Sequence, residues 1–300
     1  MFNPLNLLVN TIEGRRILPN PRFRGDFFSE VIIMPDVKKC LTIAGSDCSG
    51  GAGIQADLKT FAAHKCYGAS VITSVVAENT AHVLSVCNIP ADEVAKQIDA
   101  VFEDIEIDAV KLGMLPTADI VKTVAHKLAE YKPAHIVCDP VLAATSGDAL
   151  ADSGIIPAYI EHIFPLVELL TPNIPEAEQF SGVKITCASD MKEAAKKISE
   201  LGAKSVLVKG GHLETGSATD ILLHNNEFSS IKTVKVESPN THGTGCTLSS
   251  AITANLALGF ALGGAVFSAK DFITEAISKS YNVGKGHGPV NHFFNLWGKS

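Results

Sequence analysis

Short apolar runs alternate with amphipathic stretches along most of this chain. From Lys38 onward the strand-like runs are 40–45, 69–77, 108–113, 135–140, 167–173 and 204–211. Helical patterns lie between them at about 54–64, 91–102, 118–131, 153–163, 175–181 and 190–201. Because parallel strands need crossover connections, usually helices, this alternation predicts a mainly parallel sheet with helices on both faces.

The last third of the chain departs from this alternation. Residues 219–236 are predicted to form an antiparallel hairpin that turns at Asn225-Asn226, because asparagine tolerates the left-handed backbone of tight turns. Two further helices are predicted at about 244–258 and 262–282. Since no linker or repeat interrupts the pattern, residues 38–300 are predicted to form one α/β domain.

Residues 1–37 are interpreted as an N-terminal extension outside this fold. Residues 1–33 hold three prolines and four arginines without clear periodicity. They lack the charged, apolar and cleavage regions of a signal peptide. They are either a flexible extension or translated sequence upstream of a start at Met34, and we favour the second interpretation.

Composition argues against several functional classes. The net charge of -7 and the isoelectric point near 5.8 argue against a nucleic-acid partner, which would need a basic face. The chain has no apolar run of about 18 residues or more, so no membrane span is expected. The seven cysteines include no C-x-x-C pair, which favours reduced thiols in a cytoplasmic protein over disulfides or a zinc site.

Functional side chains follow the predicted strands where each strand ends. In sheets of this type, ligands bind at the carboxyl ends of the strands. The positions expected on this rim are Asp47, Glu78, Met114, Asp139, Asn173 and Lys209. Their convergence predicts the place of the functional site.

The segment "HGTGCT" (242–247) is the sharpest single motif. Its glycines precede a predicted helix, where free N–H groups and the helix dipole favour a bound anion. Cys246 would lie in the first turn, which favours its thiolate. The alternative is a small buried cysteine with no chemical role.

Two further segments have both structural and chemical interpretations. In "TPNIPEAE" (171–178), Asn173 and Glu176 either cap a helix or hold Mg²⁺ through water. Lys209 either ends a strand in solvent or binds phosphate, with Gly210 and Gly211 allowing close backbone approach. Asp139 is likewise a turn residue or a carboxylate directed at metal or phosphate.

The segment "GAGIQA" (51–56) matches the dinucleotide fingerprint G-x-G-x-x-A, with Glu78 further along the chain. A nicotinamide enzyme is therefore an alternative. Against it, five residues separate Gly45, at the end of the strand, from the first glycine of the motif, whereas the true fingerprint turns directly after its strand. The chain also has no G-x-x-x-x-G-K-[ST] motif.

Together, "LTIAGSDCSGGAGIQADLKTF", "KLGMLP", "DPV", "TPNIPEAE", "VKGGH" and "THGTGC" resemble the hydroxymethylpyrimidine/phosphomethylpyrimidine kinases, in the ribokinase-like superfamily. The resemblance covers residues 38–300. It implies a three-layer sandwich, a mainly parallel central sheet with helices on both faces. It also implies two ATP- and Mg²⁺-dependent phosphorylations in thiamine biosynthesis, of an aminopyrimidine alcohol and then of its phosphate, by a homodimer.

The resemblance also assigns roles to residues. Gly243, Thr244 and Gly245 would form the anion hole, and Cys246 would accept the hydroxymethyl proton in place of the superfamily's usual aspartate. Lys209 would neutralise the transferring phosphate, Asp139 would order the phosphates, and Asn173 and Glu176 would hold Mg²⁺ through water. The pyrimidine pocket maps to Gly45, Ala52, Asp57, Glu78, Met114 and Val141.

Two positions depart from the family pattern. Relatives often carry glutamine at the position of Glu78, which supplies both a donor and an acceptor, whereas a carboxylate only accepts. We expect the substrate class to be retained, with a proton on Glu78 or on the ring. Thr145 replaces a lysine found in some relatives. The alternatives are a pyridoxal kinase of the same superfamily and a non-catalytic ligand-binding module.

Overall fold

The computed structural model describes residues 36–142, 154–211 and 217–296, together with the short strands β1 (Thr11–Ile12), β2 (Arg15–Leu18) and β3 (Ile32–Ile33). The chain divides into two compact units, Met1–Val37 and Lys38–Ser300. Strands β1, β2 and β3 pair antiparallel within the first unit. The second unit contains the other elements and the cavity discussed below.

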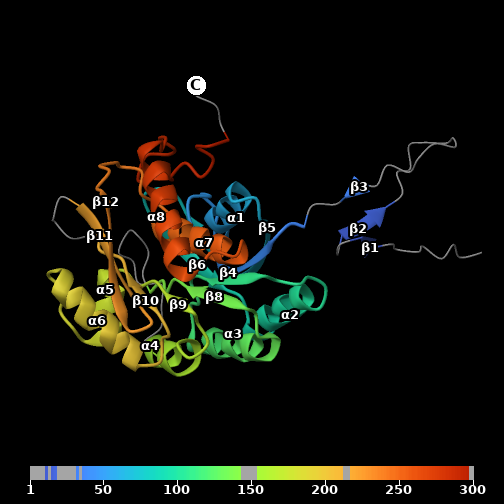
Figure 1. The fold of residues 1–300 in the computed structure, drawn as a ribbon, viewed down its shortest axis with the longest axis horizontal. Coiled ribbons are helices and arrows are strands. Elements are labelled where there is room, and N and C mark those ends of the chain that lie inside the picture. The colour runs from blue at the N-terminus through green and yellow to red at the C-terminus, as the bar shows by residue number, and fades with distance from the viewer. Residues whose placement is uncertain are drawn as a thin grey trace, which may run out of the picture. The chain divides into compact units, whose positions relative to one another are not determined.

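Within the described residues, the second unit is built on a nine-stranded sheet in the order β12-β11-β10-β9-β8-β7-β4-β5-β6 (Figure 1). The strands from β10 to β5 in this order run parallel, and antiparallel strands flank them on both sides. The bounds are β4 (Lys39–Asp47), β5 (Tyr67–Glu78), β6 (Val83–Asn88), β7 (Ala109–Leu112), β8 (His135–Cys138), β9 (Leu169–Leu170), β10 (Val206–Val208), β11 (Ser217–His224) and β12 (Glu227–Val234).

Helices cover both faces of this sheet, as predicted (Figure 1). One face carries α1 (Gly53–Ala63), α7 (Thr244–Ala257) and α8 (Leu262–Ser278). The other face carries α2 (Ala91–Phe102), α3 (Ala118–Tyr131), α4 (Ile155–Ala158), a π-helical turn (Tyr159–Ile163), α5 (Ile174–Ser181) and α6 (Ala188–Glu200). The arrangement is the predicted three-layer α/β sandwich.

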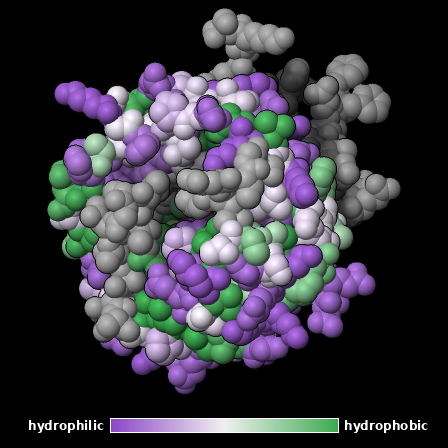
Figure 2. All heavy atoms as spheres, turned by 90° about the vertical axis from the view of Figure 1, so that its left-hand side faces the viewer, coloured by the Kyte–Doolittle hydropathy of each residue, from purple (hydrophilic) through white to green (hydrophobic). Residues whose placement is uncertain are grey.

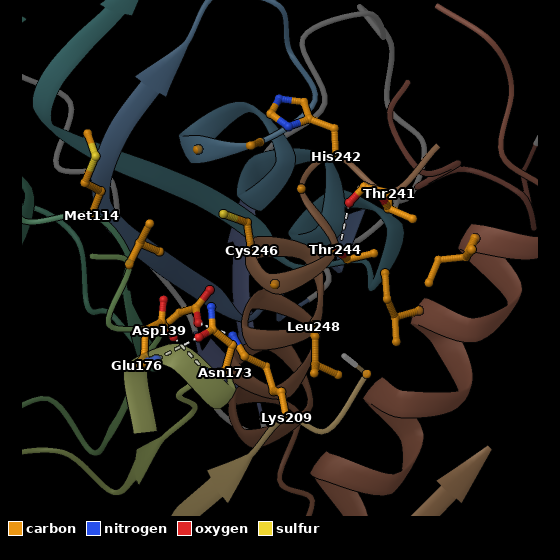
Figure 3. Close-up of a pocket in the computed structure, with 18 of the residues that line it drawn as sticks. Met114, Asp139, Asn173, Glu176, Lys209, Thr241, His242, Thr244, Cys246 and Leu248 are labelled. Carbon is orange, nitrogen blue, oxygen red and sulfur yellow. Dashed lines mark hydrogen bonds and ion pairs between the residues drawn. The ribbon is translucent and has the colours of Figure 1, made fainter. Parts of the chain in front are cut away.

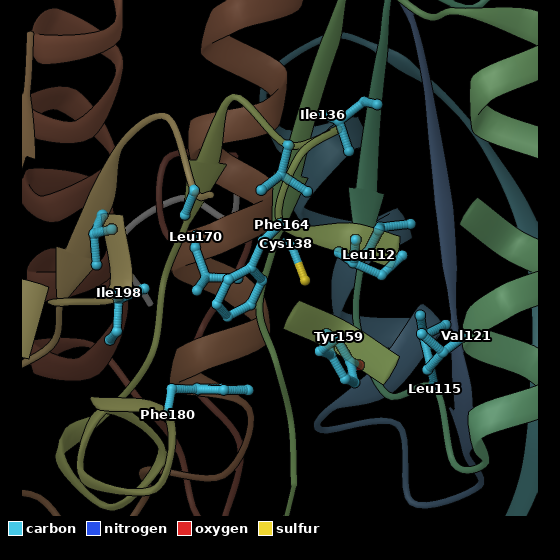
Figure 4. Close-up of a cluster of buried hydrophobic side chains, with 14 of the residues drawn as sticks. Leu112, Leu115, Val121, Ile136, Cys138, Tyr159, Phe164, Leu170, Phe180 and Ile198 are labelled. Atoms are coloured by element: carbon cyan, nitrogen blue, oxygen red, sulfur yellow. The ribbon is translucent and has the colours of Figure 1, made fainter. Parts of the chain in front are cut away.

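The central strands are apolar along their whole length because both of their faces are buried. In β8, Ile136 and Cys138 belong to the core under α3 and α6, whereas Val137 between them packs in the core under α7 and α8. This split follows from the two-residue period of a strand. Figure 4 shows the first of these cores, with Leu170 of β9 beside the ring of Phe164.

Helix α7 lies in the middle of its layer and is buried on all sides. Every residue from Thr247 to Ala257 is buried, and the helix contacts α1, α8 and the strands β4, β7 and β8. Small side chains such as Ser250 and Ala254 allow this close packing. A helix buried on all sides fixes its first turn firmly with respect to the sheet.

Most predicted elements are confirmed, and the differences have local causes. The hairpin turns where predicted, with Asn225 and Asn226 at φ 49° and 62°. The edge strand β6 was not predicted; its residues after Val83 are exposed, so no buried face marks it in the sequence. The helix predicted over 153–163 is a short α-helix followed by a π-helical turn. Thr145 lies outside the described residues.

Hydrophilic side chains are interspersed with smaller hydrophobic groups on the face shown in Figure 2. Among the helices that the structure describes, none combines the length and the apolar character that a bilayer span requires.

Candidate active site

A cavity of about 840 Å³ opens at the carboxyl ends of the parallel strands. One end is lined by residues that follow β4, β5 and β7, and the other by side chains of β12 and α8 such as Val234 and Ile277. The first turn of α7 lies between these ends (Figure 3). All six residues expected on the strand-end rim line this cavity: Asp47, Glu78, Met114, Asp139, Asn173 and Lys209.

The turn before α7 is held by glycine and by the C-terminal segment. Gly243 is the N-cap of the helix at φ 79°, and a side chain there would collide with the backbone of Gly51. The backbone of His242 donates to the carbonyl of Gly288 at 3.1 Å. The first N–H groups of α7 have no acceptor one turn earlier in the helix. The N–H of Thr244 donates to the Thr241 carbonyl at 3.3 Å, so the N–H groups of Gly245 and Cys246, which line the cavity, are the donors left for an anion.

A lysine and three oxygen-bearing side chains lie beside this turn (Figure 3). Lys209 Nζ donates to Asp139 Oδ1 at 2.5 Å. A Cβ atom on Gly245 would lie 3.2 Å from Asp139 Oδ2 and 3.3 Å from Lys209 Nζ, so the ion pair contacts the helix start. Burial alone lowers the pKa of Lys209, but the Asp139 and Glu176 carboxylates outweigh it and raise the pKa. The lysine is therefore a mostly buried cation, 14% exposed, beside the turn formed by residues 243–246, which we call the anion turn.

Asn173 and Glu176 form the reciprocal capping box of α5. Asn173 Oδ1 accepts from the Glu176 backbone at 2.9 Å, and Glu176 Oε2 accepts from the Asn173 backbone at 2.8 Å. Both residues also line the cavity, so the capping and site interpretations hold together. Burial raises the pKa of Glu176 to about 7, although Lys209 opposes the shift.

Cys246 lies on the cavity wall in the first turn of α7, but the predicted preference for its thiolate is wrong. Burial raises the pKa of the thiol to about 11, and the opposing effects of the Lys111 ammonium and the Gly53 N–H do not compensate. The helix dipole is a smaller effect than this loss of solvation. The side chain is therefore a thiol at neutral pH.

The predicted pyrimidine pocket forms the other end of the cavity, lined by Gly45, Ala52, Glu78, Met114 and Val141. A Cβ atom on Gly45 would lie 2.7 Å from Met114 Cε, so the absence of a side chain at Gly45 leaves room for the Met114 side chain. The pairing of β4 with β5 is irregular between Ala44 and Ser46. Such irregularities bend a strand and redirect its side chains toward a site.

The predicted place of Asp57 in the pyrimidine pocket is wrong, because Asp57 does not line the cavity. Its side chain has no exposed surface and forms an ion pair with the equally buried Lys111 at 2.8 Å. It also accepts from Thr42 Oγ1 at 2.6 Å and from Ser250 Oγ at 2.7 Å. With its acceptor positions occupied, Asp57 supports the cavity floor, and it is Lys111 that lines the cavity.

The predicted role of Gly210 in binding phosphate is also corrected. Its N–H donates to Asp220 Oδ1 at 2.9 Å, so this amide is not free to bind phosphate. Glycine is needed there because a Cβ atom would collide with the carbonyl of Thr219 in β11. Its neighbour Gly211 is exposed and lines the cavity.

The dinucleotide alternative is also excluded by this geometry. The Asp47 carboxylate accepts from the backbones of Ser49, Gly51 and Ala52 at 2.7, 3.0 and 2.7 Å. The amides that would bind a pyrophosphate in a dinucleotide fold are therefore occupied by a side chain of the same loop.

Several site residues were missed by the sequence analysis. His242 Nε2 donates to the Asp47 carboxylate at Oδ2, at 2.9 Å, and Lys270 pairs with the buried Asp220 at 2.6 Å. Both pairs line the cavity, as does Lys111. The position of His242 beside "GTGC" was an available signal, whereas the partners of Lys111 and Lys270 are distant in sequence.

Comparison with known proteins identifies the family. The model of the phosphomethylpyrimidine kinase family matches residues 47–291. The chain belongs to this family. The hydroxymethylpyrimidine/phosphomethylpyrimidine kinase of Haemophilus influenzae is 44% identical over 87% of this chain and 98% of that protein. A thiamine biosynthesis bifunctional protein of Geobacter sulfurreducens is 48% identical over 84% of this chain, which spans only 51% of that protein.

Solved structures agree with this membership. A phosphomethylpyrimidine kinase from Clostridium difficile superimposes with a TM-score of 0.72 at 47% identity, covering 80% of this chain and 99% of that one. A pyridoxal kinase of Bacillus subtilis in complex with ADP gives a TM-score of 0.82 at 39% identity, covering 87% and 100%. The ribokinase-like fold and the assignment as a phosphotransferase are confirmed.

The correction at Asp57 can be tested by stability. Asp57→Asn leaves Lys111 buried without its counter-charge, and we expect the free energy of unfolding to fall by about 3–5 kcal/mol. The double variant Asp57→Leu with Lys111→Met removes both charges and should recover most of this loss. Urea unfolding measures both. An Asp57→Asn protein of unchanged stability that fails to bind substrate would instead make Asp57 a substrate ligand.

Proposed function

We propose that this chain uses ATP to phosphorylate the hydroxymethyl group of 4-amino-5-hydroxymethyl-2-methylpyrimidine, and then phosphorylates the monophosphate to the diphosphate. The observation that carries the proposal is the position of the α7 turn between the two ends of one cavity. A phosphate bound at this turn would be next to Lys209 and within reach of a hydroxyl group from the Glu78 end. The names of the family relatives support the substrate class.

The two ends of the cavity differ as two different substrates require. Val234, Ile273 and Ile277 give the end near α8 an apolar lining that suits a flat nucleotide base. The Glu78 end combines Met114 with polar groups. Phosphoryl transfer depends mainly on positioning and charge neutralisation, and the anion turn with Lys209 supplies both.

The residues beside the turn fit a Mg²⁺ ion bound through water. Asn173 and Glu176 offer hard oxygen atoms, but their capping bonds occupy part of each side chain, which favours water-mediated binding over direct ligation. When bound, the ion would neutralise phosphate charge. The burial that raises the pKa of Glu176 to about 7 also makes this carboxylate a site that gains from a nearby cation.

Product analysis tests the function directly. Incubation with ATP, Mg²⁺ and the aminopyrimidine alcohol should give the monophosphate first and the diphosphate later, as separated by ion-pair chromatography. Because one anion turn serves both steps, Lys209→Met should slow both by a similar factor. Absence of both products would overturn the proposal, and a monophosphate alone would restrict it to the first step.

We propose that Cys246 accepts the hydroxyl proton through its thiolate fraction. That fraction is small at neutral pH and grows with pH below about 11, so kcat at saturating substrate should rise nearly tenfold per pH unit above pH 7. Cys246→Ala should lower kcat by roughly 100-fold and leave the aminopyrimidine Kd nearly unchanged. Cys87→Ala, at an exposed thiol of β6, is the matched control. A pH-independent kcat would reduce Cys246 to a positioning residue.

Residues 38–300 are proposed to form a single ribokinase-like kinase domain, with residues 1–37 as an extension. Among the residues that the structure describes, those that line the cavity begin at Ala44. A variant that begins at Met34 is therefore expected to keep the kcat and the melting temperature of the full chain. A loss of either would show that the first 33 residues contribute to the fold or the site.

The protein is also proposed to act in the cytoplasm as a homodimer. The exposed edge strand β6 supports the dimer, because Leu84 is 71% exposed there and apolar edge strands tend to become covered. Size-exclusion chromatography with light scattering tests the homodimer.

A pyridoxal kinase activity is the second candidate function, since the Bacillus subtilis structure named for it shares this fold. Assay of both substrates side by side separates the two.

A further inference from the structure

Two carboxyl groups and an imidazole meet at the pyrimidine end of the cavity. Asp47 ends β4, Glu78 ends β5, and His242 belongs to the turn before α7. Their oxygen and nitrogen atoms lie within 4.8 Å of one another. The pairing of β5 with β6 shifts register between Ala77 and Glu78, and such a bulge redirects a side chain. The fold therefore brings a second carboxyl group to a carboxylate that is already buried.

Asp47 is the member of this group that stays ionised. Its Oδ2 atom accepts from the backbones of Gly51 and Ala52 and faces His242 Nε2, and its Oδ1 atom accepts from the backbone of Ser49. Burial alone raises the pKa of Asp47, but the hydrogen bonds from His242, Ser49 and Ala52 lower it well below its usual range.

These contacts also argue against a metal site. Three contacts already occupy Oδ2, so a cation could bind there only by displacing the amides that shape the loop. His242 Nε2 is likewise directed at Asp47, at 2.9 Å. The group is a hydrogen-bonded network that holds a proton, and Glu78, which also interacts with Asp47, lines the cavity.

Glu78 is the member that takes up the proton. Two carboxylates this close do not both ionise readily, because each disfavours the charge of the other. Burial and the Asp47 charge raise the pKa of Glu78 to about 7, and His242 opposes the shift. Asp47 raises the pKa of His242 in turn, although burial lowers it.

The other titratable groups around Glu78 are engaged elsewhere. Lys59 on α1 donates to the Gly50 carbonyl at 2.7 Å. His287, on the C-terminal segment, directs its ring at the Pro239 carbonyl. The Cys48 thiol donates to the backbone carbonyl of Glu78 at 3.1 Å and not to its carboxyl group. Asp47 and His242 are therefore the groups that set the protonation of Glu78.

A protonated carboxyl group presents one donor beside one acceptor. The edge of an aminopyrimidine presents the complement, a ring nitrogen that accepts and an exocyclic amine that donates. A carboxylate would satisfy only the amine and leave the ring nitrogen facing a negative charge. A site built to pair both atoms discriminates strongly against rings that lack one of them.

We propose that Glu78 recognises the aminopyrimidine edge with one bound proton, that Asp47 acts as the positioning residue that favours this proton on Glu78, and that His242 keeps Asp47 ionised and limits the pH range over which Glu78 holds the proton. The proposal rests on the proposed function, because it concerns the same substrate. It assigns a role to Asp47 and His242, which touch the proton-binding group and not the reacting atoms. Substrate binding is then linked to the uptake of one proton above neutral pH.

The pH dependence of binding tests this proposal. With the intact protein, the Kd for the aminopyrimidine alcohol is measured by calorimetry from pH 6 to 9, in buffers of different ionisation heat. The wild-type Kd should weaken roughly 50-fold between pH 7 and pH 9, because only the protonated fraction binds and this fraction falls from about one half to about one hundredth. Proton uptake should approach one per site at the higher pH. Glu78→Gln keeps the shape but needs no proton, so its Kd should stay flat over this range.

His242→Gln separates positioning from simple support of the loop. It keeps a donor for Asp47 but removes the positive charge that lowers the pKa of Glu78, so the pH at which binding weakens should move upward. A loss of affinity without a shifted midpoint would give His242 a purely structural role. Equal, flat Kd profiles for wild type and Glu78→Gln would overturn the proposal.

The binding experiment and the product analysis distinguish a failure of the Glu78 proposal from a failure of the proposed function. If no phosphorylated product forms but binding shows the proton linkage, the ligand assignment stands and the kinase proposal falls. If both products form while binding takes up no proton, the kinase proposal stands and the role of Glu78 is overturned.

Discussion

The close contact between two glycine turns is the constraint on which the site depends. Gly243, before α7, leaves no room for a side chain against Gly51, in the loop after β4. Asp47 closes the same junction by binding the amides of its own loop and the His242 ring together. The turn before α7 and the proposed pyrimidine pocket therefore share one junction, which fixes the distance between them.

Buried ion pairs lie around this junction, and the fold must compensate the cost of removing their charges from water. Lys111 and Asp57 lie without exposed surface beneath the cavity, and Lys270 pairs with Asp220 beside its other end. Removing charges from water is costly, so such pairs persist only where further hydrogen bonds complete them, as Thr42 and Ser250 do for Asp57. The electrostatic field of the site therefore depends partly on ion pairs that the surrounding fold completes.

Much of the fold could be predicted from the sequence, because strands buried on both faces leave short, continuous apolar runs. The six parallel strands, the helix at 118–131 and the Asn225-Asn226 turn follow from local patterns, whereas the exposed edge strand β6 does not. The ends of the parallel strands also brought most site residues together, because topology fixes that rim. Pairings distant in sequence could not be read in this way. Asp57 is paired with Lys111 and Ser250, and no local pattern indicates either partner. The same limit applies to Cys246, because its protonation depends on how deeply the completed fold buries it.

Two carboxyl groups with a pKa of about 7 stand at opposite sides of the α7 turn, and their surroundings give them opposite uses. Glu176 lies beside the Lys209 cation, so added positive charge nearby favours its ionised form. Glu78 lies beside the Asp47 anion, so a neutral ring that needs a donor favours its protonated form. Burial thus raises the pKa of both carboxyl groups. Glu176 is the one that a nearby cation would return to its ionised form, and Glu78 is the one that its neighbour Asp47 favours in the neutral form. The difference arises from the sign of one neighbouring residue, which makes the partners of each carboxyl group more informative than its residue type.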